Sequence, residues 1–278
     1  VFEKITLAKN YLIPRILNDY HVEEEEISLK ENTLKALILN YTSEAGVRDL
    51  QRKLHDIYRK IILQSMKEEQ NLHVSLEPKD LKKYLDTKDL KEQDKPSLHE
   101  CGLVNMLAVT TFGGAVTQVE VVSYNGKGDV YTTGSLGDTL KESLKVVTSY
   151  IKANSSIFAL NDNAFNKKNI HFHFLSGAIP KNGPSAGVSI TTSLISLLKN
   201  KKVSKDIAFT GEMTLRGEIL PVGGIKEKLI GAYNYGIKTV YIPSKNKNDV
   251  KEIPKEVKNN LEIILVSNYL EIYEDIFN

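Results

Sequence analysis

The sequence predicts an α/β (α+β) domain preceded by a small all-α helical bundle. Residues 1 to about 70 carry apolar side chains at helical spacing, and from residue 101 onward alternating β-branched segments are interleaved with amphipathic ones. Between them, residues 86–100 are charged, contain a proline and hold almost no large apolar side chains. We therefore divide the chain into a helical unit at 1–85, a linker at 86–100 and an α/β domain at 101–278.

The helical unit contains three predicted helices joined by short links. Pro14 predicts a kink or break in the first helix, because proline lacks the amide hydrogen that the helical ladder requires. The spacing of Ser28 and Glu31 is that of a capping box before the second helix. A short strand and a helix that begins after Pro78 complete the unit. The three helices are predicted over 2–17, 27–41 and 44–70.

The α/β domain is predicted from the change of hydrophobic period along the chain. A Gly-Gly turn separates two strands within 103–124, and 125–134 reads as a hairpin or a short strand. The remaining elements are predicted as a helix capped by Ser135, a strand at 169–177, a helix at 184–198, two short strands within 207–224, a helix closed by Gly236, and strands at 238–243 and 261–267.

Composition excludes several classes of protein. Thirty-seven Lys and Arg residues against 35 Asp and Glu give a net charge of +2, so nucleic-acid binding is not indicated. No apolar run approaches the roughly 20 residues that cross a bilayer, so no membrane segment is expected. Cys101 is the single cysteine, which rules out an intrachain disulfide and fits a reducing compartment.

Ser185 stands out because glycines and a proline precede it and an apolar run follows. Pro184 suits the first turn of a helix, which would place the Ser185 hydroxyl near unpaired backbone N–H groups. Those groups could hold an oxyanion, and the serine could act as a nucleophile if a base lies nearby. Taken alone, this stretch favours an ordinary helix cap.

Two kinds of side chain could supply the base. His171 and His173 share one face of a predicted strand, but no cysteine or close carboxylate completes a metal-ligand set, so a structural role is favoured and no metal is expected. A lysine could serve if burial lowers its pKa by several units. Lys226 and Lys228 flank the apolar face of their helix at equal angles, so periodicity does not choose between them.

Together these segments resemble the Lon family of ATP-dependent AAA+ serine proteases, which use a Ser–Lys dyad. "PKNGPSAG" is similar to the family's nucleophile motif, and "TGEMTLRGEILPVGGIKEKLIGA" resembles its lysine motif. "GSLGDTLKES", "IHFHF" and "GIKTVYIP" match in the same order. The resemblance implies Ser185 as nucleophile, Lys228 as general base and Thr210 as the threonine beside the dyad lysine.

The helical unit resembles the small lid subdomain of the AAA+ module. "YTSEAGVRDLQRKL" carries this likeness and implies Arg48 as the sensor-2 arginine that reaches toward nucleotide phosphates; in isolation Arg48 would be a surface residue at a helix start. No G-x-x-x-x-G-K-[ST] occurs, so the Walker site is not in this stretch. The resemblance implies ATP and Mg²⁺ in the full-length protein through that missing ATPase core, and no cofactor in proteolysis itself.

The resemblance also implies partners and a setting. Unfolded or damaged proteins are the expected substrates and a homo-hexamer the expected assembly. The composition and the divergent loop before Ser185 favour the mitochondrial matrix, with the bacterial cytoplasm as the alternative. Two other functions stay open: a small-molecule kinase-like phosphate-binding domain, since a glycine-rich turn at a helix start can cradle phosphate, and a catalytically silent assembly module.

Overall fold

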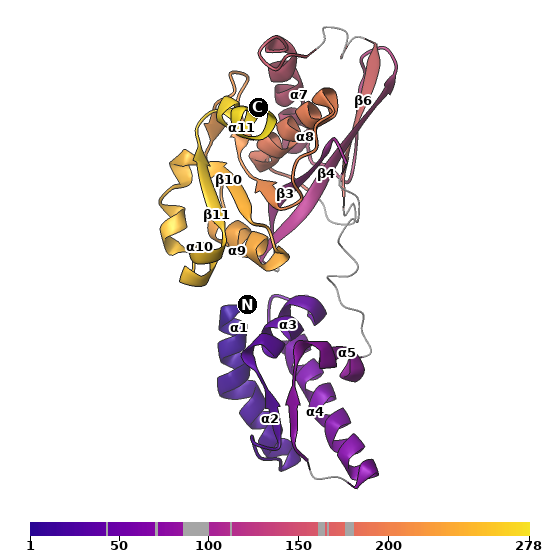
Figure 1. Ribbon diagram of the computed structural model, residues 1–278, viewed down its shortest axis with the longest axis vertical. Coiled ribbons are helices and arrows are strands. Elements are labelled where there is room, and N and C mark those ends of the chain that lie inside the picture. Colours follow the sequence, from indigo (N-terminus) through magenta and orange to yellow (C-terminus); the bar gives the residue numbers. More distant parts are fainter. Residues whose placement is uncertain are drawn as a thin grey trace. The chain divides into compact units, whose positions relative to one another are not determined.

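The computed structural model describes residues 1–42, 44–69, 72–85, 100–111, 113–160, 165, 167–175 and 181–278. The chain forms two compact units, Val1–Ser97 and Leu98–Asn278, each with its own hydrophobic core. The predicted linker at 86–100 lies outside the described residues apart from Glu100. The predicted class, an α/β domain preceded by a helical unit, is confirmed (Figure 1).

The first unit is mainly helical. Its helices are α1 Phe2–Leu7, α2 Ile13–Tyr20, α3 Glu31–Tyr41, α4 Arg48–Glu68 and α5 Leu81–Tyr84. The break predicted at Pro14 is a π-turn at Ala8–Leu12, which joins α1 to α2 just before the proline. The unit is not purely helical, because strands β1 Ile27–Leu29 and β2 Val74–Leu76 form a short parallel pair.

The second unit is built on a mixed seven-stranded sheet with the order β11-β10-β7-β3-β4-β6-β5. β3 pairs antiparallel with β4 and β4 with β6, while the other neighbours are parallel. The strands are β3 Leu103–Thr110, β4 Gly113–Asn125, β5 Val130–Thr133, β6 Lys168–Phe174, β7 Ile207–Phe209, β10 Thr239–Pro243 and β11 Glu262–Val266, and a separate pair comprises β8 Glu212–Met213 and β9 Ile219–Leu220.

Helices cover both faces of this sheet. The helices are α7 Asp138–Ala153, α8 Gly187–Lys199, α9 Ile225–Tyr235, α10 Lys255–Asn260 and α11 Tyr269–Phe277 (Figure 1). On one face of the sheet, Val104 and Met106 of β3 belong to the core formed with α7, α8 and α11. On the other face, α9 packs on β4 at Gly114.

Three local expectations need correction. Of the two readings of 125–134, the short strand is confirmed as β5 and the hairpin is wrong: β5 pairs parallel with β6, because α7 lies between them in sequence as a crossover. Ser135 does not cap α7, whose N-cap is Gly137, and Ser28 lies in β1 while Lys30 is the N-cap of α3.

The C-terminal helix α11 was missed by the sequence analysis. Asn268 and Glu271 form a capping box at its start: the Asn268 side chain accepts from the Leu270 amide, and Glu271 accepts from the Asn268 amide at 2.8 Å. That spacing was present in the sequence and could have revealed the helix.

Candidate active site

Ser185 lies in a 3-10 turn, Pro184–Ala186, that leads directly into α8. Pro184 occupies the first position of the turn, as predicted, and Gly183 before it has a φ of 148°, a conformation that residues with a Cβ adopt at a cost. No side-chain hydrogen bond caps the turn. The N-cap residues of the turn and of α8 are Gly183 and Ala186, so Ser185 does not occupy the capping position that the bare sequence favoured.

Backbone hydrogen bonds hold this turn against the segment that follows β7. The Gly211 amide donates to the Ser185 carbonyl at 2.9 Å, and the Val188 amide donates to the Gly211 carbonyl at 3.1 Å. The Thr210 amide donates in turn to the carbonyl of Tyr241 in β10. The turn carrying Ser185 is thus tied to the central strands of the sheet.

Thr210 connects Ser185 with Lys228. Its side chain is fully buried; its Oγ1 accepts a hydrogen bond from Lys228 Nζ at 3.0 Å and donates to the Ser185 carbonyl at 3.4 Å. The three residues are far apart in sequence and come from α9, the end of β7 and the turn before α8. The structure therefore brings together all three residues that the resemblance assigned to the dyad and its support.

The amine of Lys228 is held in an environment that disfavours its charge. The residue is 4% exposed, and among the described residues no carboxylate pairs with it. Burial lowers the pKa of Lys228 from 10.5 to about 8. A substantial neutral fraction is available near physiological pH, as a general base requires.

Close backbone contact fixes the position of α9. A Cβ on Gly114 of β4 would lie 1.7 Å from the Glu227 carbonyl oxygen, and one on Gly231 would lie 2.4 Å from the Gly114 carbonyl carbon. Only glycine at both positions lets the helix backbone touch the strand. This contact sets the depth at which Lys228 is buried.

The structure distinguishes the two lysines that periodicity left equal. Lys226 is exposed, whereas Lys228 is buried and hydrogen-bonded. Within the described part of the chain, no hydrogen bond joins Ser185 Oγ to Lys228 Nζ; the amine is bound to Thr210 instead.

His171 and His173 lie on one face of β6, on the far side of β4 from β3. Both rings contact Thr133 Oγ1, at 3.0 Å from His171 Nε2 and 2.7 Å from His173 Nδ1. No cluster of three or more metal-binding side chains occurs among the residues that the structure describes. The pair belongs to a sheet face shared with Tyr131, whose ring lies 6.3 Å from that of His171.

Arg48 is the first residue of α4 in the other unit, and its side chain is exposed. Glu44, which no sequence pattern singled out, shapes this helix start: its carboxylate accepts hydrogen bonds from the amides of Asp49 and Leu50, at 3.0 and 2.8 Å. Because a carboxylate is stabilised at a helix N-terminus, Glu44 fixes the turn that presents Arg48.

Comparison with known protein families matches both parts of the chain. The family model of the Lon protease (S16) C-terminal proteolytic domain matches residues 75–278, and that of the Lon protease AAA+ ATPase lid domain matches residues 18–74. The chain belongs to the Lon protease family.

Curated relatives agree with this assignment. The Lon protease of Mycoplasma mycoides is 43% identical over 276 residues, which is 99% of this chain and 34% of the relative. The Lon protease of Mycoplasma pneumoniae is 42% identical over 279 residues, which is 99% of this chain and 35% of the relative. The Lon protease of Rickettsia bellii is 39% identical over 272 residues, which is 98% of this chain and 35% of the relative. The chain thus spans about a third of the length of the relatives it matches.

The relatives named are bacterial, and none of the comparisons supports a small-molecule kinase or a silent assembly module. No helix in the described residues is long and apolar enough to span a membrane.

Proposed function

We propose that this chain is the lid and proteolytic part of an ATP-dependent serine endopeptidase in which Ser185 is the nucleophile and Lys228 the general base. The observation that carries the proposal is the buried Lys228 amine, whose pKa is lowered to about 8 and which is connected through Thr210 to the backbone of Ser185. A buried lysine without a carboxylate partner costs stability, and a role in proton transfer explains why the chain places one beside a serine.

The proposed reaction begins with rotation of the Ser185 hydroxyl toward Lys228. The neutral amine takes the hydroxyl proton as the serine oxygen attacks the peptide carbonyl. The N–H groups of Ser185 and Ala186 are the ones proposed to stabilise the oxyanion, because the first amides of a helical turn lack intrahelical acceptors, whereas Pro184 has no N–H and the Gly187 amide already donates to the Pro184 carbonyl. Lys228 then protonates the leaving amine, and a water deprotonated by the same lysine hydrolyses the acyl-enzyme. Thr210 acts as a positioning residue that orients the amine.

The wider activity is proposed for the whole protein. Family membership supports unfolded or damaged proteins as substrates, a homo-hexameric assembly, and ATP with Mg²⁺ bound through an ATPase core, with the exposed Arg48 reaching toward the nucleotide as sensor 2. The proteolytic step itself is proposed to need no cofactor. For the compartment, the bacterial relatives favour the cytoplasm over the mitochondrial matrix that composition suggested.

Peptide cleavage by single variants of the intact protein tests the dyad. Ser185→Ala and Lys228→Ala are expected to lower kcat by a factor of about 10³ or more, because each removes a group that acts in the bond-making step. Lys226→Ala is the matched control, since Lys226 lies two residues away on the same helix and is exposed; its kcat should stay within about twofold of wild type. Wild-type rates in Ser185→Ala or Lys228→Ala would refute the assignment, and loss confined to Lys226→Ala would transfer the role of base to that lysine.

A further inference from the structure

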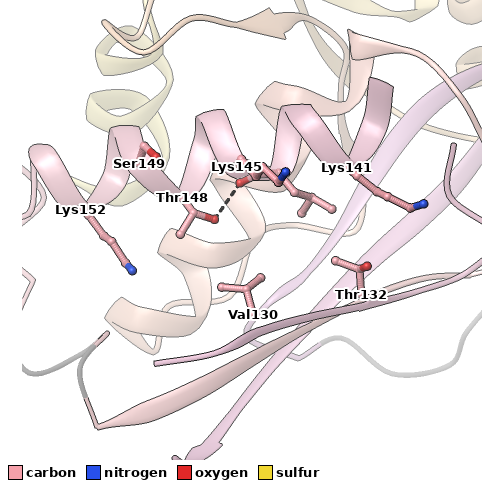
Figure 2. A pocket seen from close by; sticks show the side chains of 8 residues that line it. Val130, Thr132, Lys141, Lys145, Thr148, Ser149 and Lys152 are labelled. Carbon is pink, nitrogen blue, oxygen red and sulfur yellow. Dashed lines mark hydrogen bonds between the residues drawn. The ribbon is translucent and has the colours of Figure 1, made fainter. Parts of the chain in front are cut away.

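A pocket of about 410 Å³ lies between α7 and the edge strand β5, outside the candidate active site (Figure 2). Its volume is in the range of pockets that hold small molecules. One wall is a single stripe of α7 and the other is one face of β5. The residues that line it are Val130, Thr132, Lys141, Leu144, Lys145, Thr148, Ser149 and Lys152.

The charged groups in the lining are all cationic. Lys141, Lys145 and Lys152 follow one side of α7, and among the residues that the structure describes no carboxylate lines the pocket. Lys141 pairs with Asp138 at 3.1 Å, but that carboxylate is 97% exposed, so the pair is weak and easily exchanged. The Lys152 amine lies 5.3 Å from the centre of the Phe165 ring, and Lys145 makes no ion pair with any residue that the structure describes.

The rest of the lining is apolar or carries hydroxyl groups. Val130 and Thr132 are alternate residues of β5 and both point toward α7 (Figure 2). Val130 is 39% exposed although it faces the helix, so the helix does not cover it. Leu144 is buried beneath the lysines, and the Thr148 hydroxyl is already bound to the Leu144 carbonyl at 2.7 Å, which leaves the threonine methyl and the leucine as an apolar floor.

We propose that this pocket binds a small amphiphilic anion, namely a phosphate monoester whose apolar part lies on Val130 and Leu144 and whose phosphate is held by Lys145 and Lys152. A phosphate monoester carries close to two negative charges at neutral pH and accepts hydrogen bonds on three oxygens, which suits the separated ammonium groups of Lys145 and Lys152. Inorganic phosphate has no apolar part to bury on Val130 and Leu144, and a neutral alcohol has no charge to pair with the lysines, so each should bind more weakly than the monoester.

Calorimetric titration of the intact protein with hexyl phosphate tests the proposal, with inorganic phosphate and hexanol as separate probes. Hexyl phosphate is expected to bind saturably, and each of the other two at least about tenfold more weakly, since each offers only half of the recognised chemistry. Raising the salt from about 0.05 to 0.5 M should weaken hexyl phosphate binding several-fold, because the lysines are exposed to screening. No saturable binding, or equal binding of inorganic phosphate, would overturn the proposal.

Variants locate the binding on this pocket. Lys145→Gln/Lys152→Gln should raise the Kd for hexyl phosphate at least about tenfold, and Val130→Thr about threefold. Lys238→Gln is the matched control, because Lys238 is exposed, lies directly before β10 and does not line the pocket. This substitution should change the Kd less than about twofold. Thermal unfolding verifies that each variant is folded, as expected for exposed side chains. An unchanged Kd in the double variant, or an equal loss in the control, would refute the site.

Discussion

At the scale of single residues, the decisive feature is a lysine amine buried against a threonine hydroxyl. Lys228 is 4% exposed and its pKa is lowered by burial to about 8, while the hydroxyl of Thr210 is its hydrogen-bond partner. The charge state of one side chain therefore controls both the proposed chemistry and part of the stability of the fold.

The pH dependence of peptidase activity should follow this amine. Because the proposed base must be neutral, kcat/KM is expected to rise about tenfold per pH unit below pH 8 and to level off above it. Initial rates on a small fluorogenic peptide between pH 6 and 9.5 measure the profile. A rate that is flat across this range would show that no group with a pKa near 8 acts as the base.

Thr210 should affect the rate through Lys228 and not through folding alone. Thr210→Val removes the acceptor of the lysine hydrogen bond and is expected to lower kcat about tenfold or more with KM little changed. Loss of a hydrogen bond to the charged amine should also move the kinetic pKa further below 8. Thr210→Ser keeps the hydroxyl and should restore both kcat and the kinetic pKa. A serine variant as slow as the valine variant would contradict the proposal that the Thr210 hydroxyl positions the Lys228 amine.

Lys228 also predicts a stability effect with a definite sign. Its folded-state pKa of about 8 lies below the unfolded value of 10.5, so the unfolded chain binds more protons and the wild type gains stability as pH rises between these values. At pH 7, Lys228→Met should increase the free energy of unfolding by up to roughly 3 kcal/mol, less the lost hydrogen bond, and this gain should shrink toward pH 10.5. Urea unfolding at pH 7 and pH 10 measures it; a gain that grows with pH would be inconsistent with a depressed pKa.

At the scale of secondary-structure elements, the site depends on how α9 and the turn before α8 meet the sheet. Gly114 and Gly231 let the backbones of β4 and α9 touch, and hydrogen bonds between Ser185, Val188 and Gly211 fasten the other side. Both arrangements are made by the backbone, so backbone contacts determine where the side chains of the proposed dyad lie.

Gly114→Ala is therefore expected to move α9. The added methyl would lie 1.7 Å from the Glu227 carbonyl oxygen, and relieving that overlap should displace Lys228, lower kcat by about tenfold or more and destabilise the unit by about 1–3 kcal/mol. Gly223→Ala is the matched control, because a Cβ there meets nothing within 4 Å. Peptidase assays and thermal unfolding compare the two; equal effects of both substitutions would argue against the contact.

Sequence patterns predicted the elements around the site well but not how they pair. The helix ended by Gly236 and the two strands β3 and β4 were read correctly, because each depends on local periodicity. The predicted Gly-Gly turn between them is wrong: Gly113 and Gly114 lie in β4, paired with Thr110 and Val109. The parallel pairing of β5 with β6 was missed, since it is set by the crossover through α7 and not by residues of β5.

The same limit applies to the candidate site. The residues at 226 and 228 are equivalent by helical angle, and only the docking of α9 on β4 shows that Lys228 is the buried one. The contact between Lys228 and Thr210 joins distant segments of the chain, so no local pattern encodes it. Resemblance to a family supplied what periodicity could not.

At the scale of the whole molecule, the chain contains two compact units with separate hydrophobic cores. One core gathers α1 to α5, and the other gathers the sheet with α7, α8 and α11, and no described residue belongs to both. Each unit is large enough to bury its own apolar surface and can unfold as a cooperative unit of its own.

Leu54→Ala should show this independence. Leu54 is fully buried in α4, so the substitution leaves a cavity and should cost about 2–5 kcal/mol in the first unit. Scanning calorimetry is expected to show one transition shifted to lower temperature and the transition of the second unit unchanged. Equal shifts of every transition would mean that the units unfold together.

The hydroxyl of Thr210 has a single hydrogen, and this has a consequence for the resting enzyme. The Lys228 ammonium can only donate hydrogen bonds, because it has no lone pair. The Thr210 hydroxyl therefore accepts from Lys228 and donates its own hydrogen to the Ser185 carbonyl. When the amine loses its proton, its new lone pair competes for that same hydrogen. The protonation state of Lys228 on α9 thereby changes the hydrogen bonding of the Ser185 carbonyl in the turn before α8, even without bound substrate.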